Sequence, residues 1–204
     1  MRADAAGRRA LRHEGGAAAV EFAIASPAIF LLLVGAVEIA VLLIVALSLG
    51  DATLEAARYG ATGFGGDAAA RDAEIRRIVA TRTLGLARDA DLRVTSVAFS
   101  MRDKDGARRV DEKGVPLTPG AVLAEALADE WLDDLNGDGV WNEGEWFDDV
   151  NGDGVWQGGG GAVGPGGPSD IVIYRIAYDW RPLVLPDFGS ATLRATAPVR
   201  NEPF

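Results

Sequence analysis

The chain contains no cysteine and one histidine, His13. Without cysteine it can form neither disulfides nor thiolate metal sites. The position of the histidine in the N-terminal tail excludes triad chemistry based on histidine. Lys and Arg are also few, 20 against 30 Asp and Glu, so the net charge is −10. This balance argues against a nucleic-acid partner, because phosphate binding requires clustered Lys and Arg.

The charge is unevenly distributed along the chain. Residues 1–16 have a net charge of +2 and the remainder has −12, with the densest acidity between Asp129 and Asp153. From Phe22 to Leu49, one ionisable side chain, Glu38, interrupts an apolar run. As a helix this run extends roughly 42 Å, enough to cross a hydrocarbon core of about 30 Å. We expect a single-pass protein of the cytoplasmic (inner) membrane. The positive-inside rule predicts a cytoplasmic N-terminus and residues 50–204 outside.

Three kinds of segment begin with a basic stretch and an apolar run. A cleaved secretory signal peptide has an apolar region of about 7–15 residues, and this one is about twice that length. A plain signal anchor fits the length. Neither of these alternatives explains Glu21, a carboxylate at the start of the apolar run.

The third kind of segment accounts for Glu21. A basic leader, then Gly16, then a glutamate five residues later before an apolar helix resembles a type IV prepilin or pseudopilin signal. The resemblance implies cleavage by a prepilin peptidase between Gly16 and Ala17. The new α-amino group of Ala17 is then a cation, and intramembrane carboxylates are expected to pair with cations. We expect Glu21 to pair with this amine on a neighbouring subunit. The alternative is that Glu21 lies in the headgroup region.

Three stretches narrow the resemblance: GGAAAVEFAIASPAIFLLLVGAVEIA, LEAARYGATG and ATAPVRNEPF. Together they resemble the TadE-like family of minor pseudopilins, over residues 8–64 and about the last 35. Members commonly have Glu-Tyr where this chain has Glu21-Phe22. The resemblance implies a role in tight-adherence (Tad, Flp-type) pilus assembly and so in cell adhesion. The implied partners are the membrane, the prepilin peptidase, other pilus or pseudopilin subunits and the assembly machinery.

The pattern after the membrane segment predicts an α+β outer domain with one or two helices and a small, mostly antiparallel sheet. A helix is expected from Asp67, with Ile75, Ile78 and Val79 inward and Gly85 as its C-terminal cap. Strands are expected at 92–101, with a bulge between Val94 and Val97, and at 171–180 and 191–199. The expected organisation is a leader (1–16), a transmembrane helix (17–49), an outer helix and first strand region (50–118), an insertion with a Gly-rich linker (119–168), and C-terminal strands (169–204).

The insertion contains the most specific motif, DLNGDGVWNEGE, at residues 134–145. It fits the calcium loop D-x-[DN]-x-[DN]-G-x5-E. Such a loop binds Ca²⁺ through side-chain oxygens, one backbone carbonyl at position seven and a bidentate glutamate at position twelve. The predicted ligands are Asp134, Asn136, Asp138, Val140 (carbonyl), Asn142 and Glu145. The alternative is an acidic surface turn.

The motif nearly repeats fifteen residues later, as DVNGDGVW at residues 149–156. Asp149, Asn151 and Asp153 return as candidate ligands, but the second copy has no glutamate of its own at position twelve. The sequence therefore predicts one Ca²⁺ site and leaves the second open. The stretch at 120–132 is a candidate for a helix entering the first loop, and residues 158–168 read as a flexible linker.

These features predict a non-enzymatic, membrane-anchored pseudopilin with a calcium-binding outer loop. The alternative function is a signal-anchored, extracytoplasmic calcium-dependent binding module. The sequence leaves open whether the subunit enters the fibre or stays with the assembly machine.

Overall fold

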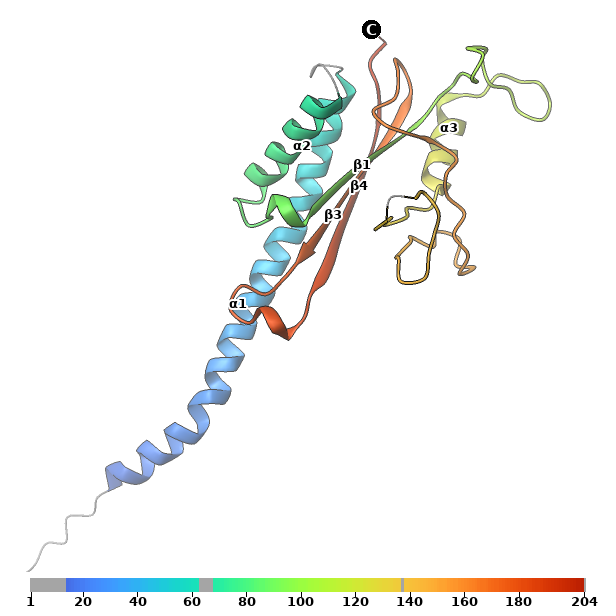
Figure 1. The fold of residues 1–204 in the computed structure, drawn as a ribbon. Coiled ribbons are helices and arrows are strands. Elements are labelled where there is room, and N and C mark those ends of the chain that lie inside the picture. Colours follow the sequence, from blue (N-terminus) through green and yellow to red (C-terminus); the bar gives the residue numbers. More distant parts are fainter. Residues whose placement is uncertain (1–13, 63–67, 137, 204) are drawn as a thin grey trace, which may run out of the picture. The chain divides into compact units, whose positions relative to one another are not determined.

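The computed structural model describes residues 14–62, 68–136 and 138–203, and they form two compact units, Met1–Val41 and Leu42–Phe204 (Figure 1). Helix α1 (Glu14–Ala61) begins in the first unit and ends in the second. Two sequence expectations concern residues outside the described ranges. They are the leader before Glu14 and Asp67 as an N-cap.

The first unit consists of the N-terminal part of α1. Large apolar side chains are exposed around it, among them Phe22, Ile24 and Leu32. The most apolar 18-residue window of Gly16–Ala61 has a mean hydropathy of 3.0, and the helix is long and apolar enough to cross a membrane. Pro27 lies inside the helix and cannot donate to the Ala23 carbonyl. The Ser26 Oγ lies 3.4 Å from that carbonyl and donates to it.

The second unit contains a four-stranded antiparallel sheet with the order β2-β1-β3-β4. The strands are β1 (Leu92–Phe99), β2 (Ala162–Val163), β3 (Ile171–Trp180) and β4 (Ala191–Arg200). The helices α2 (Ala68–Arg82) and α3 (Pro119–Ala128) lie on opposite sides of the sheet (Figure 1). Two 3-10 turns, Asp89–Asp91 and Pro186–Phe188, precede β1 and β4. The predicted α+β class is confirmed.

The alternation of β3 divides the sheet into two covered faces. Tyr174 and Tyr178 lie on the face covered by helices, where the Tyr178 Oη donates to the Leu86 carbonyl at 3.1 Å. Ile171 and Ile173 lie on the other face, in a core cluster with Val97, Phe99, Val122 and Ala126. The predicted strand at 171–180 is therefore confirmed, with both of its faces buried.

Helix α2 packs with the predicted stripe. Ile75, Ile78 and Val79 are all buried. Gly85 has a φ of +73°, and its N–H donates to the Ala80 carbonyl at 2.8 Å. A glycine in the left-handed region with this hydrogen bond is a common C-terminal cap. The predicted cap is confirmed.

The predicted bulge in the first strand is wrong. Pairing between β1 and β3 is uninterrupted from Leu92, opposite Tyr178, to Phe99, opposite Ile171. The apolar phase changes along β1 because different elements cover its two faces, so Leu92 is buried on one face and Val97 on the other. The strand also ends at Phe99 instead of residue 101.

The glycine-rich stretch at 158–168 is ordered against the sheet and is not a free linker. It contributes β2, which pairs with β1, and the Gly164 N–H donates to the Ser96 carbonyl at 2.8 Å. A Cβ on Gly161 would lie 2.4 Å from Val97 Cγ1. Glycine is therefore required there by close approach to β1.

Helix α3 occupies the predicted entry to the insertion. The Thr118 Oγ accepts from the Ala121 N–H at 3.2 Å and caps its first turn. The helix ends at Ala128, four residues before the predicted end. Residues 129–133 then connect the helix to the first loop, and Asp129 and Asp133 pair with arginines of the sheet.

Candidate functional site

The predicted cleavage residues lie in the first turns of α1. Gly16, Ala17 and Glu21 are all exposed. Ala17 and Glu21 are four residues apart and so share one face of the helix. A Cβ at Gly16 would meet no atom within 4 Å, so packing within the described residues does not require glycine there. Two consecutive glycines also weaken this turn, by about 1 kcal/mol each relative to alanine.

The first predicted calcium loop closes on its own side chains. The Gly139 N–H donates to Asp134 Oδ2 at 2.8 Å, which bends the chain back to position one. Glu145 reaches across the loop from position twelve, where its Oε1 accepts from the Leu135 N–H at 2.9 Å and its Oε2 from the Asn142 N–H at 3.0 Å. The structure therefore brings positions one, six, nine and twelve together.

Amide groups converge on the central carboxylate of the first loop. Asn136 Nδ2 and Asn142 Nδ2 both donate to Asp138 Oδ2, at 3.1 and 3.0 Å. Hydrogen bonds from the Val140 N–H, then from Asn142 and Asn136, lower the pKa of Asp138 below its ordinary value. The group is thus ionised at neutral pH. Asn142 Nδ2 also donates to the Val140 carbonyl at 2.9 Å, so amide nitrogens face two of the predicted oxygen ligands.

The second loop repeats this pattern. The Gly154 N–H donates to Asp149 Oδ2 at 2.8 Å, as Gly139 does to Asp134. Asn151 Nδ2 donates to Asp153 Oδ2 at 3.2 Å. Gln157, at position nine, donates its side-chain amide to the same Asp153 oxygen, as Asn142 does in the first loop. The structure therefore adds Gln157 to the residues that sequence reasoning assigned to this loop.

Glu130 lies against the second loop from a position upstream of the first. Its Oε2 accepts from the Gln157 N–H at 2.7 Å, and its backbone carbonyl accepts from Trp156 Nε1 at 3.1 Å. Glu145 makes the same two contacts in the first loop, to the Asn142 N–H and to Trp141 Nε1 at 3.1 Å. Glu130 is thus the structural counterpart of Glu145.

A symmetric pair of hydrogen bonds joins the two loops. The Asp133 N–H donates to the Trp146 carbonyl and the Asp148 N–H to the Trp131 carbonyl, both at 2.8 Å. Between them Leu132 forms an antiparallel bridge with Phe147. Each donor and acceptor is related to its counterpart by fifteen residues. The rings of Trp131 and Trp146 pack edge to face, with centroids 6.2 Å apart.

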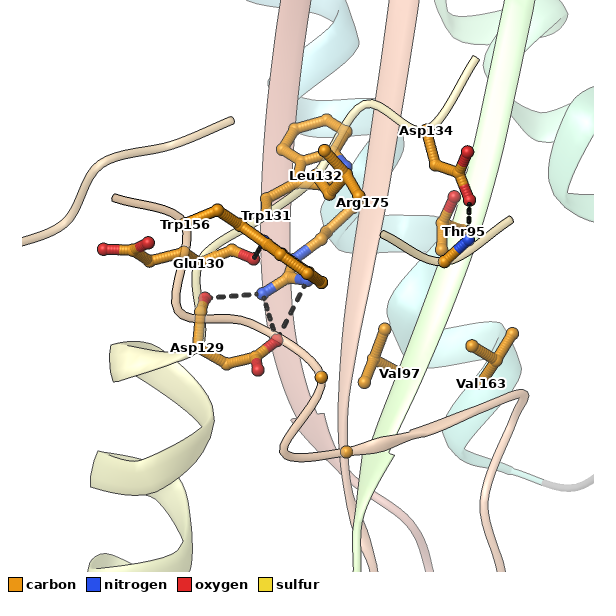
Figure 2. Close-up of a pocket in the computed structure, with 13 residues that line it drawn as sticks. Thr95, Val97, Asp129, Glu130, Trp131, Leu132, Asp134, Trp156, Val163 and Arg175 are labelled. Atoms are coloured by element: carbon orange, nitrogen blue, oxygen red, sulfur yellow. Dashed lines mark hydrogen bonds and ion pairs between the residues drawn. The ribbon is translucent and has the colours of Figure 1, made fainter. Parts of the chain in front are cut away.

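Two aspartates attach this segment to the sheet. Asp129 accepts from Arg175 NH2 on β3 through its Oδ2 at 3.2 Å and its carbonyl at 2.9 Å (Figure 2). Burial lowers the pKa of Arg175, and Asp129 opposes that shift. Asp133 accepts from Arg93 on β1 and Arg194 on β4, at 2.8 and 3.1 Å. These pairs hold the residues on either side of Glu130 in place.

A cavity of ≈ 140 Å³ lies between the sheet and the loops. Trp156, Leu132 and Glu130 contribute to its wall, together with Arg175. In Figure 2 the Glu130 carboxylate points away from the Arg175 guanidinium, toward the second loop. Over the ranges that the structure describes, no group of three or more His, Cys, Asp or Glu side chains is placed to hold a metal ion.

The C-terminal residues that entered the family resemblance have a structural role. Asn201 is buried, and its Nδ2 donates to the carbonyls of Pro165 and Gly167 at 2.8 and 3.0 Å. The Glu202 N–H donates to the Ala61 carbonyl at 3.1 Å. Within this ending, Asn201 holds the chain that follows β2 and Glu202 contacts the last turn of α1.

Sequence reasoning missed Glu130 because the calcium motif starts at the first aspartate. The signal was present four residues earlier. Glu130-Trp131 and Asp133-Asp134 recur as Glu145-Trp146 and Asp148-Asp149, so the full repeat is fifteen residues, 130–144 and 145–159. The arginine anchors were also missed, although Arg93, Arg175 and Arg194 occupy alternating positions of their strands that face α3.

Comparison with known proteins identifies one region. The family model described as TadE-like protein matches residues 16–58. The match begins at the predicted cleavage glycine and covers Glu21 and most of α1. It confirms the TadE-like resemblance over a shorter range than the sequence reading gave. No curated protein and no solved structure matches the chain.

Proposed function

We propose that this chain is a membrane-anchored, TadE-like pseudopilin that takes part in the assembly of a Tad-type pilus. The main support is that the TadE-like match, residues 16–58, lies on a helix that is long and apolar enough to span a membrane. The N-terminus lies in the cytoplasm and the outer domain on the far side of the inner membrane. The basic residues before the helix support this orientation.

Processing by a prepilin peptidase is part of the proposal. The cut falls between Gly16 and Ala17 and leaves α1 in the membrane. Both residues are exposed, and the double glycine lowers the free-energy cost of unwinding the first helical turn. A protease needs an extended substrate, so a weak first turn favours cleavage. Open space around Gly16 supports a requirement for glycine that comes from the peptidase.

Glu21 has a role in assembly under this proposal. After cleavage the α-amino group of Ala17 lies one helical turn before Glu21. Within a bilayer, a carboxylate and an amine are each costly alone and are stabilised as a pair. Pairing between the glutamate of one subunit and the amine of the next would set their axial register.

Calcium binding at residues 134–145 is the second part of the proposal. Hydrogen bonds to Asp134 and Glu145 close the loop from both ends, and the lowered pKa of Asp138 keeps that carboxyl ionised. Residues 130–159 carry nine carboxylates and no Lys or Arg, so a divalent cation would relieve repulsion. A calcium-dependent binding module is the alternative function, favoured by the attachment of this acidic repeat to the sheet through Asp129 and Asp133.

Cross-linking in membranes tests the assembly role. A photoreactive residue at Ile24, whose side chain is 76% exposed, would report neighbours of α1 beside Glu21. In Glu21→Gln we expect the cross-link to pilus subunits to weaken while processing and membrane insertion continue. Ser26→Ala, on the same helix, is the matched control and should cross-link as the wild type does. Undiminished cross-linking in Glu21→Gln would contradict the pairing and favour the alternative that Glu21 lies in the headgroup region.

A further inference from the structure

The second loop lacks a position-twelve glutamate of its own, yet a glutamate contacts it. Glu130 is 2% exposed, and its Oε2 accepts from the N–H of position nine. Glu145 makes the same contact in the first loop at a similar distance. The two carboxylates are equivalent by contact as well as by the fifteen-residue repeat.

The other oxygen of Glu130 is the observation that points to a ligand. Glu130 Oε1 is buried and has no hydrogen-bond partner in the described part of the chain. The equivalent Glu145 Oε1 accepts from the Leu135 N–H. A buried carboxylate oxygen without a partner is costly, and a bound cation removes that cost. The Oε2 of Glu130 accepts from the Gln157 N–H, which places the carboxylate beside the loop that contains Asp149, Asn151 and Asp153.

The two backbone hydrogen bonds between the repeats, from Asp133 to Trp146 and from Asp148 to Trp131, explain how Glu130 reaches the second loop from a position before the first. Each repeat begins with its glutamate and continues into its own loop. Because the repeats pair antiparallel through Leu132 and Phe147, the opening glutamate of one repeat closes the loop of the other. The chain therefore needs no glutamate after the second loop.

We propose that residues 130–159 bind two calcium ions, and that Glu130 supplies the bidentate carboxylate of the second site. This inference rests on the proposed calcium binding at the first loop. The first site uses Glu145, which opens the second repeat, and the second site uses Glu130, which opens the first repeat. Each repeat thus supplies the bidentate glutamate of the other repeat's loop. Asp149, Asn151, Asp153, the Val155 carbonyl and Gln157 complete the second site.

The test counts ions on the full chain, purified in detergent and freed of calcium with a chelator. Calorimetric titration with CaCl₂ and native mass spectrometry should give two ions per wild-type chain. Glu145→Gln and Glu130→Gln should each retain one ion, and the double variant none. Glu143→Gln is the matched control, because Glu143 is exposed in the first loop and is not a predicted ligand. It should bind two.

Two further variants cover the case in which Glu130→Gln does not fold. Asp149→Asn changes an exposed ligand and should remove the same single ion. Glu130→Asp keeps the charge but shortens the reach, and should weaken one site at least tenfold. Two ions with unchanged affinity in Glu130→Asp would overturn the role of Glu130. A single ion on the wild type that is still bound by Glu130→Gln would overturn the second site and leave the first site standing. No ion on the wild type would overturn both.

Discussion

Calcium should raise the melting temperature of the outer domain, through both loops of the repeat at 130–159. Extracellular sites of this type have dissociation constants of about 10⁻⁴–10⁻³ M. At tenfold excess over that constant, each site adds RT ln 11, or about 1.4 kcal/mol, to the free energy of unfolding. Two sites add about 2.8 kcal/mol. For a unit as large as Leu42–Phe204, about 2–4 °C per kcal/mol gives a shift of roughly 6–11 °C.

The assay is thermal unfolding of the full chain in detergent, followed by tryptophan fluorescence. Four of the five tryptophans lie in the repeat, so the emission reports mainly on this segment. Calcium is compared with chelator plus NaCl at the same ionic strength, which separates binding from screening of the carboxylates. Glu145→Gln should roughly halve the shift, and Glu143→Gln should leave it unchanged. Identical melting curves with calcium and with chelator would refute the reasoning.

Two further predictions concern the sheet. Gly60→Ala should lower the free energy of unfolding by about 1–2 kcal/mol, since its Cβ would lie 1.9 Å from the Tyr174 Oη and overpacking outweighs the gain in helix propensity. Urea unfolding measures this, and an equal loss on a Tyr174→Ala background would contradict the clash. Arg93 lowers the pKa of Asp179, so its contribution is present above an unfolded pKa of about 3.9 and is lost at lower pH. The stability difference between wild type and Asp179→Asn should therefore shrink as the pH falls below about 4, and a difference that grows there would contradict the pairing.

The periodicity of apolar residues predicts an element correctly when one period describes its buried residues along the whole element. The stripe of Ile75, Ile78 and Val79 and the alternation of β3 each reflect a single period, and the structure contains both. The bulge in β1 was wrong because a period-two pattern assumes one constant buried face. Different elements cover the two faces of β1, and a sequence pattern does not reveal which residue meets which element.

The loops show the same limit at the candidate site. Their ligand spacing is local, so Asp134 to Glu145 could be predicted as one loop. Closure of the second loop by Glu130 depends on antiparallel pairing of the repeats through Leu132 and Phe147, a contact that spacing alone does not specify. Likewise, Ala162 and Val163 form β2 only because nearby glycines let the chain approach Val97 and Phe99.

The intact mass of the protein extracted from membranes tests the central claim most directly. A processed pseudopilin begins at Ala17 and lacks residues 1–16, as N-terminal sequencing would also show. Gly16→Leu should retain the full mass, because a bulky side chain should not fit where the peptidase accepts glycine, whereas Gly15→Leu should still be cut. A mature chain that begins elsewhere, near Ser48 after secretory cleavage or at the first residue of an uncut anchor, would contradict the account.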